Sequence, residues 1–340
     1  MSNTQRVPAR PAAAGTPATG PSHHPEGTRY PVPALSSGLG AGTIAAARPQ
    51  VRWGAILPFR AWPVLAIGLL LLVAWYGLSL HGNWPQGQQA AQPPAGGSPA
   101  GFWQIAGQAM QLDNPWVPPP HQVVHSLWNG LFGPQDAPDA VRIHLGTTAE
   151  EAGLGLLCGS MLGLLIATLF VHVRVLELGF LPYVVASQTV PVLALAPILI
   201  SLVGLGLAAK VLVATYLVFF AVTVSAVKGF KSADALAHEL LRSYAANPWQ
   251  IYWKLRFPAA LPYIFTGLKI GSTAALVGAI VAELVGSEYG LGALLVAGTN
   301  FNRYLLLWSA MLAASLLGLA AYLAIAALER LVVRVPRVSL

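Results

Sequence analysis

The sequence predicts an all-α protein that crosses a membrane with about six helices. Of its 340 residues, 55% are hydrophobic and only 9% are charged, and the mean hydropathy is +0.61. A soluble domain of this length does not have such a composition. The apolar residues form runs of about twenty, which is long enough to cross a hydrocarbon core of ~30 Å. Most of the lysines and arginines lie between these runs or near the ends of the chain.

The N-terminal part predicts a tail, one span and a long connection. Residues 1–60 are rich in proline, alanine, glycine and serine, so we expect a disordered tail. The first apolar run, Trp62–Leu80, predicts a first transmembrane helix over residues 61–81. Residues 82–145 are polar and proline-rich and predict an extracytoplasmic connection.

A core of packed membrane helices is expected over residues 146–330, followed by a short tail over residues 331–340. The second span carries Gly155, Gly159 and Gly163 at four-residue steps, which predicts a face where another helix packs closely. Residues 286–303 are rich in glycine and predict a turn or a short re-entrant connection. The predicted core spans are Gly146–Val171, Leu178–Val203 (interrupted by three prolines), Val211–Val227, Tyr263–Val285 and Tyr304–Leu328.

The basic residues predict the orientation of the spans. With the N-terminal tail inside, fifteen of the 19 lysines and arginines fall in cytoplasmic segments, as the positive-inside rule requires. Both termini and the loop over residues 228–262 are then cytoplasmic. The net charge of +7 is spread over several loops, so we expect no nucleic-acid partner.

The sequence also argues against chemistry within this chain. The single cysteine, Cys158, leaves no partner for an intrachain disulfide. Gly204–Lys210 comes closest to a phosphate-binding P-loop but has Ala209 where the second glycine belongs, so we expect no bound ATP. His121 and His125 have a spacing suited to a metal on a helix, but no third ligand is evident. We therefore expect no metal site, no cofactor and no catalytic residue in this chain.

The loop over residues 228–262 predicts two short helices between two spans. The first runs from about Ala233 to Tyr244 with one apolar stripe. Asn247 followed by Pro248 is typical of a helix start, so the second helix runs from Pro248 to about Arg256. This second helix carries three large aromatic side chains on a segment too short and too charged to enter lipid.

This loop resembles the EAA signature loop of ABC importer permeases. The resemblance rests on Glu239-Leu240-Leu241, Ala245-Ala246-Asn247, Trp249-Gln250 and the run Phe257 to Pro262, and it extends over roughly Gly146–Arg330. The form of the motifs is similar to the branch for nitrate, sulfonate, taurine and pyrimidine precursors. The resemblance implies the type I ABC importer permease fold and a coupling helix that docks on a separate ATPase. The implied coupling residues are Glu239, Ala245, Ala246, Trp249, Gln250 and Trp253.

The loop departs from the family pattern at the turn between its helices. The signature's alanines are Leu240 and Leu241 here, and its glycine is Ala245. Glycine is favoured where a turn needs a positive φ, and another residue there costs on the order of 1 kcal/mol. We therefore expect that Asn247 takes the left-handed position or that the turn is reshaped.

Polar residues within the spans are the candidates for a translocation path, because a polar group in hydrocarbon usually faces the bundle interior. They also fit a second interpretation, hydrogen bonds between packed helices. Glu283 is a candidate outer gate or a solvated helix end. Lys269 is expected to extend its side chain towards the cytoplasmic surface. The path candidates are Ser187, Gln188, Thr189, Thr215, Tyr216, Ser272 and Thr273.

These observations predict the transmembrane permease subunit of an ATP-driven, binding-protein-dependent importer in the bacterial inner membrane. The resemblance implies a small organic solute or oxyanion as substrate: a sulfonate, taurine, nitrate, or a pyrimidine or vitamin precursor. It also implies a homodimer of permeases, two ATPase subunits that carry ATP and magnesium, and a periplasmic substrate-binding protein. An ion-coupled secondary carrier or channel is the main alternative, and a membrane scaffold is another.

Overall fold

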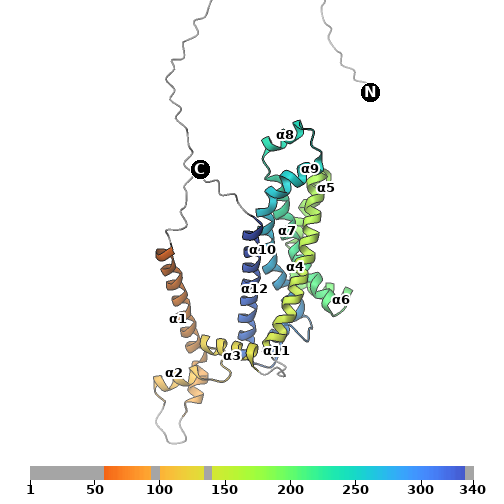
Figure 1. The fold of residues 1–340 in the computed structure, drawn as a ribbon. Helices are drawn as coiled ribbons and strands as arrows, with labels where there is room; N and C mark the ends of the chain where they lie inside the picture. The colour runs from red at the N-terminus through yellow and green to blue at the C-terminus, as the bar shows by residue number, and fades with distance from the viewer. Residues whose placement is uncertain (1–56, 93–99, 134–139, 334–340) are drawn as a thin grey trace, which may run out of the picture. The chain divides into compact units, whose positions relative to one another are not determined.

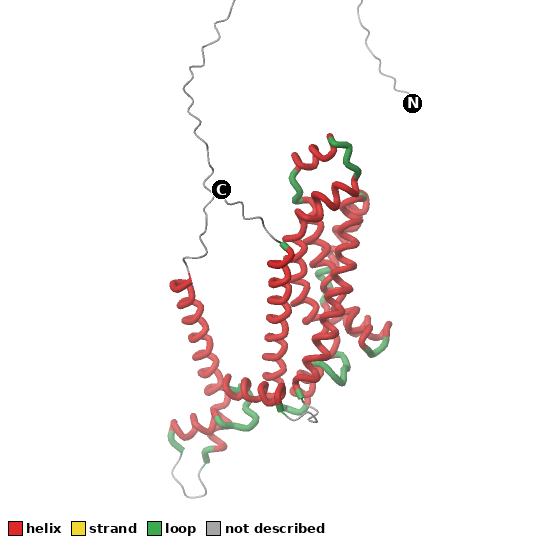
Figure 2. The backbone as a smooth tube through the Cα atoms, viewed as in Figure 1, coloured by secondary structure: helices red, strands yellow, loops and turns green. Residues whose placement is uncertain are grey.

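The computed structural model describes residues 57–92, 100–133 and 140–333, and in these ranges every regular element is a helix (Figures 1 and 2). The described residues from Arg60 onward belong to one compact unit. Residues 1–56 and 334–340 of the predicted tails lie outside the described residues, whereas residues 57–60 belong to α1 and residues 331–332 to α12, so both helices extend into the predicted tails. The elements are α1 (Leu57–Ala90), α2 (Phe102–Met110), α3 (Pro120–Phe132), α4 (Val141–His172), α5 (Arg174–Ser187), α6 (Val192–Val203), α7 (Leu207–Lys231), α8 (Ala235–Ser243), α9 (Pro248–Ile251), the π-helical turn η2 (Tyr252–Arg256), α10 (Phe257–Leu284), α11 (Leu291–Asn300) and α12 (Tyr304–Val332).

Five of the described helical segments are long and apolar enough to cross a membrane, in agreement with the sequence pattern. They are α1, α4, α7, α9 to α10, and α12. The predicted third span is not one straight helix. It consists of α5 and α6, which meet at a bend of 103°. Pro191 precedes α6 and has no backbone N–H to donate, so the α5 helix ends before it.

Helix α7 occupies the centre of the bundle, with α4 and α10 packed against it (Figure 1). Gly155, Gly159 and Gly163 lie on one face of α4 and allow the backbones of α4 and α7 to approach closely. A Cβ atom on Gly159 would lie 2.6 Å from Val218 Cβ, and one on Gly163 would lie 2.7 Å from the Phe219 carbonyl oxygen. No side chain fits in such a space, so the predicted packing face is confirmed and its partner is α7.

Helices α2 and α3 and the C-terminal part of α1 lie at the end of the bundle opposite α8 and α9 (Figure 1). We call the end that carries α8 and α9 the α8 end of the bundle, and the opposite end, where α11 lies, the α11 end. Helix α3 covers Val123–Leu131, and the Ser309 hydroxyl of α12 lies 2.9 Å from the Ser126 hydroxyl of α3. Helix α1 is held at its C-terminal half, where Ser79 donates a hydrogen bond of 2.7 Å to the Val117 carbonyl. The α1 helix continues beyond the expected span to Ala90.

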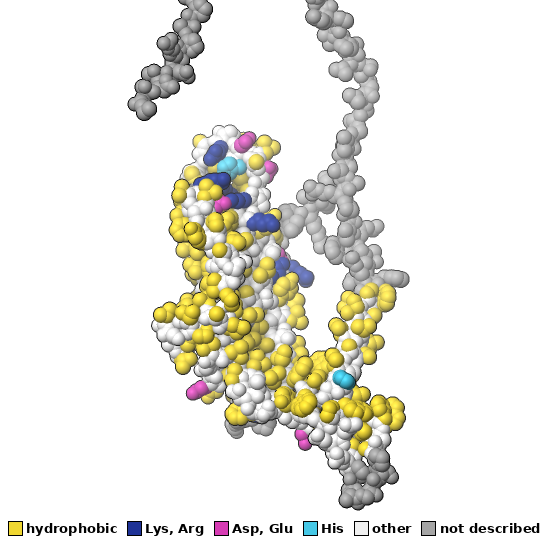
Figure 3. Space-filling model, turned by 180° about the vertical axis from the view of Figure 1, so that it is seen from behind, with side chains coloured by type: hydrophobic (Ala, Val, Ile, Leu, Met, Phe, Trp, Pro, Cys, Tyr) yellow, Lys and Arg dark blue, Asp and Glu magenta, His cyan; other side chains and the backbone are white. Residues whose placement is uncertain are grey.

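Side chains are distributed unevenly along the bundle. On the face shown in Figure 3, lysine and arginine gather towards the α8 end, and the flanks of the bundle are largely hydrophobic. Many large apolar side chains of α1, α4, α5 and α6 are exposed in the isolated chain. An apolar flank with charge at its ends is the pattern of a protein embedded in a bilayer.

Candidate functional site

Residues 232–256 join α7 to α10 and project at the α8 end of the bundle (Figure 1). We call them the coupling segment. Helix α8 begins after Asp234, whose side chain accepts a hydrogen bond of 3.1 Å from the Leu236 N–H. Helices α9, η2 and α10 follow one another without a break, so the exposed loop is joined directly to a spanning helix. Leu236 and Leu240 of α8 are exposed, although an apolar stripe normally packs against another surface.

The turn between α8 and α9 resolves the question raised by Ala245. Ala245 itself adopts the left-handed conformation, with φ +57°. Its N–H donates to the Arg242 carbonyl, and the Ala246 N–H donates to the Leu241 carbonyl, which together form a Schellman helix end. The expectation that Asn247 takes the left-handed position was wrong. Asn247 has φ −73° and caps α9, in a reciprocal pair of hydrogen bonds with Gln250.

Three aromatic residues of the coupling segment divide into one anchor and two exposed side chains. Tyr252 is buried, and its hydroxyl lies 2.8 Å from Thr168 Oγ1 of α4. Trp249 and Trp253 flank the Tyr252 ring at centroid distances of 5.4 and 5.3 Å. Their exposed fractions are 57% and 54%. The two tryptophan side chains are therefore exposed, and both contact the Tyr252 ring, which is buried against the helical bundle.

A basic cavity of about 550 Å³ lies beside the coupling segment. The carboxylate of Glu239 lines it and is on an exposed residue of α8. Lys231 and Glu177 both line the cavity and form an ion pair, so their charges neutralise each other. Burial, and then the positive charges of Arg256 and Arg242, lower the pKa of His238 from its ordinary value. The cavity's other cations are Arg174, Arg242 and Arg256.

Four of the predicted path residues come together at the bend between α5 and α6. The Tyr216 hydroxyl of α7 donates a hydrogen bond of 2.7 Å to the Ser187 carbonyl, at the last residue of α5. Gln188 and Thr189 follow in the bend and are exposed. Tyr216 therefore supplies a donor where the helix ladder is interrupted.

The remaining path candidates lie elsewhere. Ser272 is buried and donates to the Lys269 carbonyl of its own helix. Thr273 is exposed and donates to the Ile270 carbonyl, while Thr215 is half-buried on α7. The structure does not bring these three to the bend. Their roles in translocation stay predictions.

Glu283 connects the end of α10 to the short helix α11. Only 1% of the residue is exposed, so the expectation of a solvated helix end was wrong. Its carboxylate accepts hydrogen bonds of 2.6 Å from Thr148 Oγ1 and 2.6 Å from the Gly292 N–H. Thr148 in turn accepts from the Leu291 N–H at 2.8 Å. A carboxylate at the start of α11 satisfies N–H groups that have no partner within that helix.

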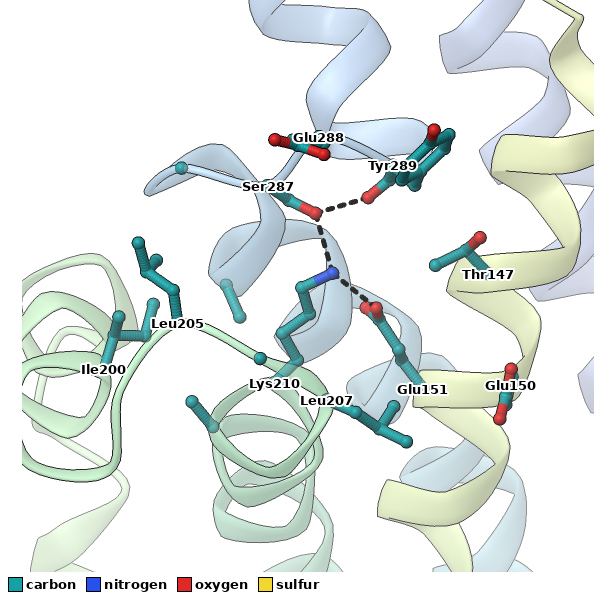
Figure 4. A pocket seen from close by; sticks show the side chains of 14 residues that line it. Thr147, Glu150, Glu151, Ile200, Leu205, Leu207, Lys210, Ser287, Glu288 and Tyr289 are labelled. Carbon is teal, nitrogen blue, oxygen red and sulfur yellow. Dashed lines mark hydrogen bonds and ion pairs between the residues drawn. The ribbon is translucent and has the colours of Figure 1, made fainter.

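A buried ion pair lies beside this network and was missed by sequence reasoning. The Lys210 ammonium of α7 lies 2.6 Å from Glu151 Oε1 of α4 and 2.7 Å from Ser287 Oγ (Figure 4). The pair borders a cavity of about 500 Å³. Two acidic residues inside an otherwise uncharged apolar run, Glu150 and Glu151, were the available signal.

Another ion pair gives Lys269 a partner that the sequence did not indicate. Its ammonium lies 2.7 Å from Glu329 Oε2 in the last turn of α12, and 19% of the Lys269 side chain is exposed. The extension of this side chain towards the cytoplasmic surface stays a prediction. Glu329 lies sixty positions later in the chain, so no local pattern predicted this contact.

The fold and the coupling segment define an α-helical transport permease: spanning helices around a central α7, and a projecting helix pair continuous with α10. The chain belongs to the family described as binding-protein-dependent transport system inner membrane component, whose model matches residues 159–337. It is therefore a permease of the ABC importer type with the type I fold, a multi-pass component of the inner membrane. Membership of this family implies an ATPase and a substrate-binding protein as partners.

Several characterised permeases are similar to this chain. The formylaminopyrimidine transport permease of Halalkalibacterium halodurans is 34% identical over 241 residues, which cover 68% of this chain and 89% of that protein. The riboflavin transport system permease of Chloroflexus aurantiacus is 36% identical over 163 residues, 48% of this chain and 61% of that protein. The taurine transport system permease of Escherichia coli is 30% identical over 203 residues, 59% of this chain and 72% of that protein.

Proposed function

We propose that this chain is the permease subunit of an importer in which a separate ATPase drives transport through the coupling segment. One observation carries the proposal. The exposed Trp249 and Trp253 stand on the buried Tyr252, and the helix that holds them continues into the spanning helix α10. Aromatic side chains of this kind are the usual energetic centres of protein interfaces. ATP and magnesium bind to the partner subunit in this proposal.

The coupling segment faces the cytoplasm in this proposal, and both termini lie on the same side. The concentration of lysine and arginine towards the α8 end supports this orientation (Figure 3). The α11 end then faces the periplasm, where a substrate-binding protein delivers the solute. Each chain offers one coupling segment, so two copies of the permease engage two ATPase subunits.

The substrate is a small organic solute. Similar permeases are named for formylaminopyrimidine, riboflavin and taurine. The sequence motifs also imply sulfonates and nitrate as possible substrate classes. The substrate-binding protein makes the first selection among such solutes in this proposal. The permease then moves the delivered solute past the bend between α5 and α6.

The double variant Trp249→Ala/Trp253→Ala tests the proposal. We expect the permease to fold and insert normally but to lose the ATPase subunit on affinity purification, because the exposed aromatic surface is gone. Trp128→Ala is the matched control, since Trp128 is equally exposed but lies on α3 at the other end of the bundle. Uptake that continues without any ATPase would instead establish an ion-coupled carrier.

A further inference from the structure

The basic cavity beside the coupling segment carries positive charge that the described residues do not neutralise. With histidine neutral, four of its lining residues are cationic and two are anionic, a formal net charge of +2. Lys231 and Glu177 form an ion pair with each other. The remaining cations, Arg174, Arg242 and Arg256, form no ion pair within the described ranges. The cavity therefore attracts an anion, and three guanidinium groups border it.

The three arginines reach the cavity from separate elements. Arg174 begins α5, Arg242 lies in the last turn of α8, and Arg256 ends η2. Arg256 Nη1 donates a hydrogen bond of 3.4 Å to the Val171 carbonyl near the end of α4. Planar guanidinium groups donate pairs of N–H groups that match the oxygens of a phosphate. The space of about 550 Å³ between these elements lies within the range of small-ligand sites.

The cavity also adjoins an apolar surface on α5. Arg174 and Leu178 are four positions apart, so they lie on the same face of this helix. Leu178 is 65% exposed and Val175, next to Arg174, is 78% exposed. Helix α5 is the first half of the bent span, so these side chains face lipid chains in the bilayer.

Within the cavity, apolar side chains lie beside the arginines. Phe170 and Phe230 are both buried and line it. A free phosphate or an acidic peptide would use the arginines but leave the apolar surface of α5 uncovered. A phospholipid uses both, because its phosphate meets the arginines while its acyl chains cover the apolar residues.

We propose that this cavity binds the head group of an anionic phospholipid. The phosphate contacts Arg174, Arg242 and Arg256, and the acyl chains lie along α5. The excess of positive charge disfavours the ammonium group of a zwitterionic head group, so the site selects a lipid with net negative charge. The bound lipid bridges α5 and α8. The inference goes beyond the proposed function and does not depend on which solute is transported.

A lipid titration of the full chain, purified with its ATPase subunit, tests this site. The complex in detergent is titrated with phosphatidylglycerol, and native mass spectrometry measures the fraction that retains one lipid. We expect tighter binding of phosphatidylglycerol than of phosphatidylcholine. Arg174→Gln and Arg242→Gln should each weaken phosphatidylglycerol binding about fivefold. The double variant should bind the two lipids about equally.

Arg330→Gln is the matched control. Arg330 is exposed in the last turn of α12, which runs towards the α8 end, and it lies outside the cavity (Figure 1). This variant removes the same charge and should bind phosphatidylglycerol like the unmodified chain. Elution of each variant with its ATPase as one symmetric peak in size-exclusion chromatography verifies folding.

Three outcomes would overturn the proposal, each for a different reason. Equal weakening in Arg330→Gln and Arg242→Gln would show a diffuse attraction to anionic lipid and no site. Binding of soluble glycerol phosphate as tight as that of phosphatidylglycerol would show that the cavity takes a free phosphate ester. The same titration on the full chain without the ATPase gives the third: phosphatidylglycerol binding that occurs only there would show that the ATPase itself occupies the cavity.

Discussion

Glu283 Oε2 accepts a hydrogen bond of 2.6 Å from the Gly292 N–H, across nine positions of sequence and a glycine-rich turn. Gly290 within that turn has φ +119° and lies so close to the Glu283 carboxyl that a Cβ atom there would collide with it. The carboxylate and the two glycines thus form one unit that fixes α11 against α10.

Replacing Glu283 with alanine should loosen α11. The change leaves the buried Gly292 N–H without its acceptor, at a cost of about 1–3 kcal/mol, and removes the shorter of the two hydrogen bonds that the Thr148 hydroxyl donates. We expect a lower melting temperature in detergent and faster hydrogen exchange over residues 286–300. Glu283→Gln keeps an acceptor oxygen and should be affected less. Unchanged exchange in Glu283→Ala would show that the contact does not hold α11.

Replacing Ala245 with glycine should stabilise the turn of the coupling segment. Ala245 has φ +57°, and a left-handed conformation costs a residue with a Cβ about 1–2 kcal/mol. Glycine removes that strain but loses some free energy through its larger unfolded-state entropy. We expect a net gain of about 0.5–1 kcal/mol, measured as slower hydrogen exchange over residues 235–250. Ala246→Gly, at a neighbour without positive φ, should give no gain.

Tyr252 should matter for the stability of the coupling segment in two separable ways. Tyr252→Phe keeps the ring stack but removes the hydroxyl that meets Thr168, so we expect a loss of about 1 kcal/mol. Tyr252→Ala empties a buried aromatic site and should cost about 3–5 kcal/mol. Thermal unfolding followed by tryptophan fluorescence measures both. Similar losses in the two variants would show that the hydroxyl, and not the ring, anchors the segment.

Acidification should loosen α8 through His238. Its folded-state pKa is lowered by burial and by Arg256 and Arg242, so the unfolded segment takes up a proton more readily. The stability of α8 should therefore fall as the pH drops through about 6.5, the ordinary histidine value. Hydrogen exchange over residues 235–243 at pH 7.5 and 5.5 measures this. His238→Gln should remove the pH-dependent part, and a pH effect that survives in this variant would assign it to another group.

Local patterns in the sequence predicted the features that depend on local chemistry. Gly159 and its neighbours on α4 marked a packing face because their spacing matches one side of a helix. Asn247 before Pro248 marked a helix start because its side chain is suited to cap the first turn. The family motifs lie within one continuous stretch of sequence, so they also placed the coupling segment between two spans.

The features that the sequence did not reveal depend on long-range contacts. Lys210 and Glu151 are 59 positions apart, so their pairing follows from the packing of α4 on α7 and from no local period. The prolines indicated an interruption in the third span, but they did not reveal that the bend of 103° places the Ser187 carbonyl against the Tyr216 hydroxyl of α7. Ala245 was unexpected because residue type alone disfavours a positive φ, whereas the ends of α8 and α9 impose it.

The unbroken path from α9 through η2 into α10 makes these elements a single lever. Helix α10 alone has 28 residues, or about 42 Å at the rise of an α-helix. A tilt of about ten degrees imposed at the tryptophans would displace the far tip by roughly 7 Å over that length. Glu283 lies at that tip, so a small rotation of the coupling segment would become a larger displacement at the α11 end of the bundle.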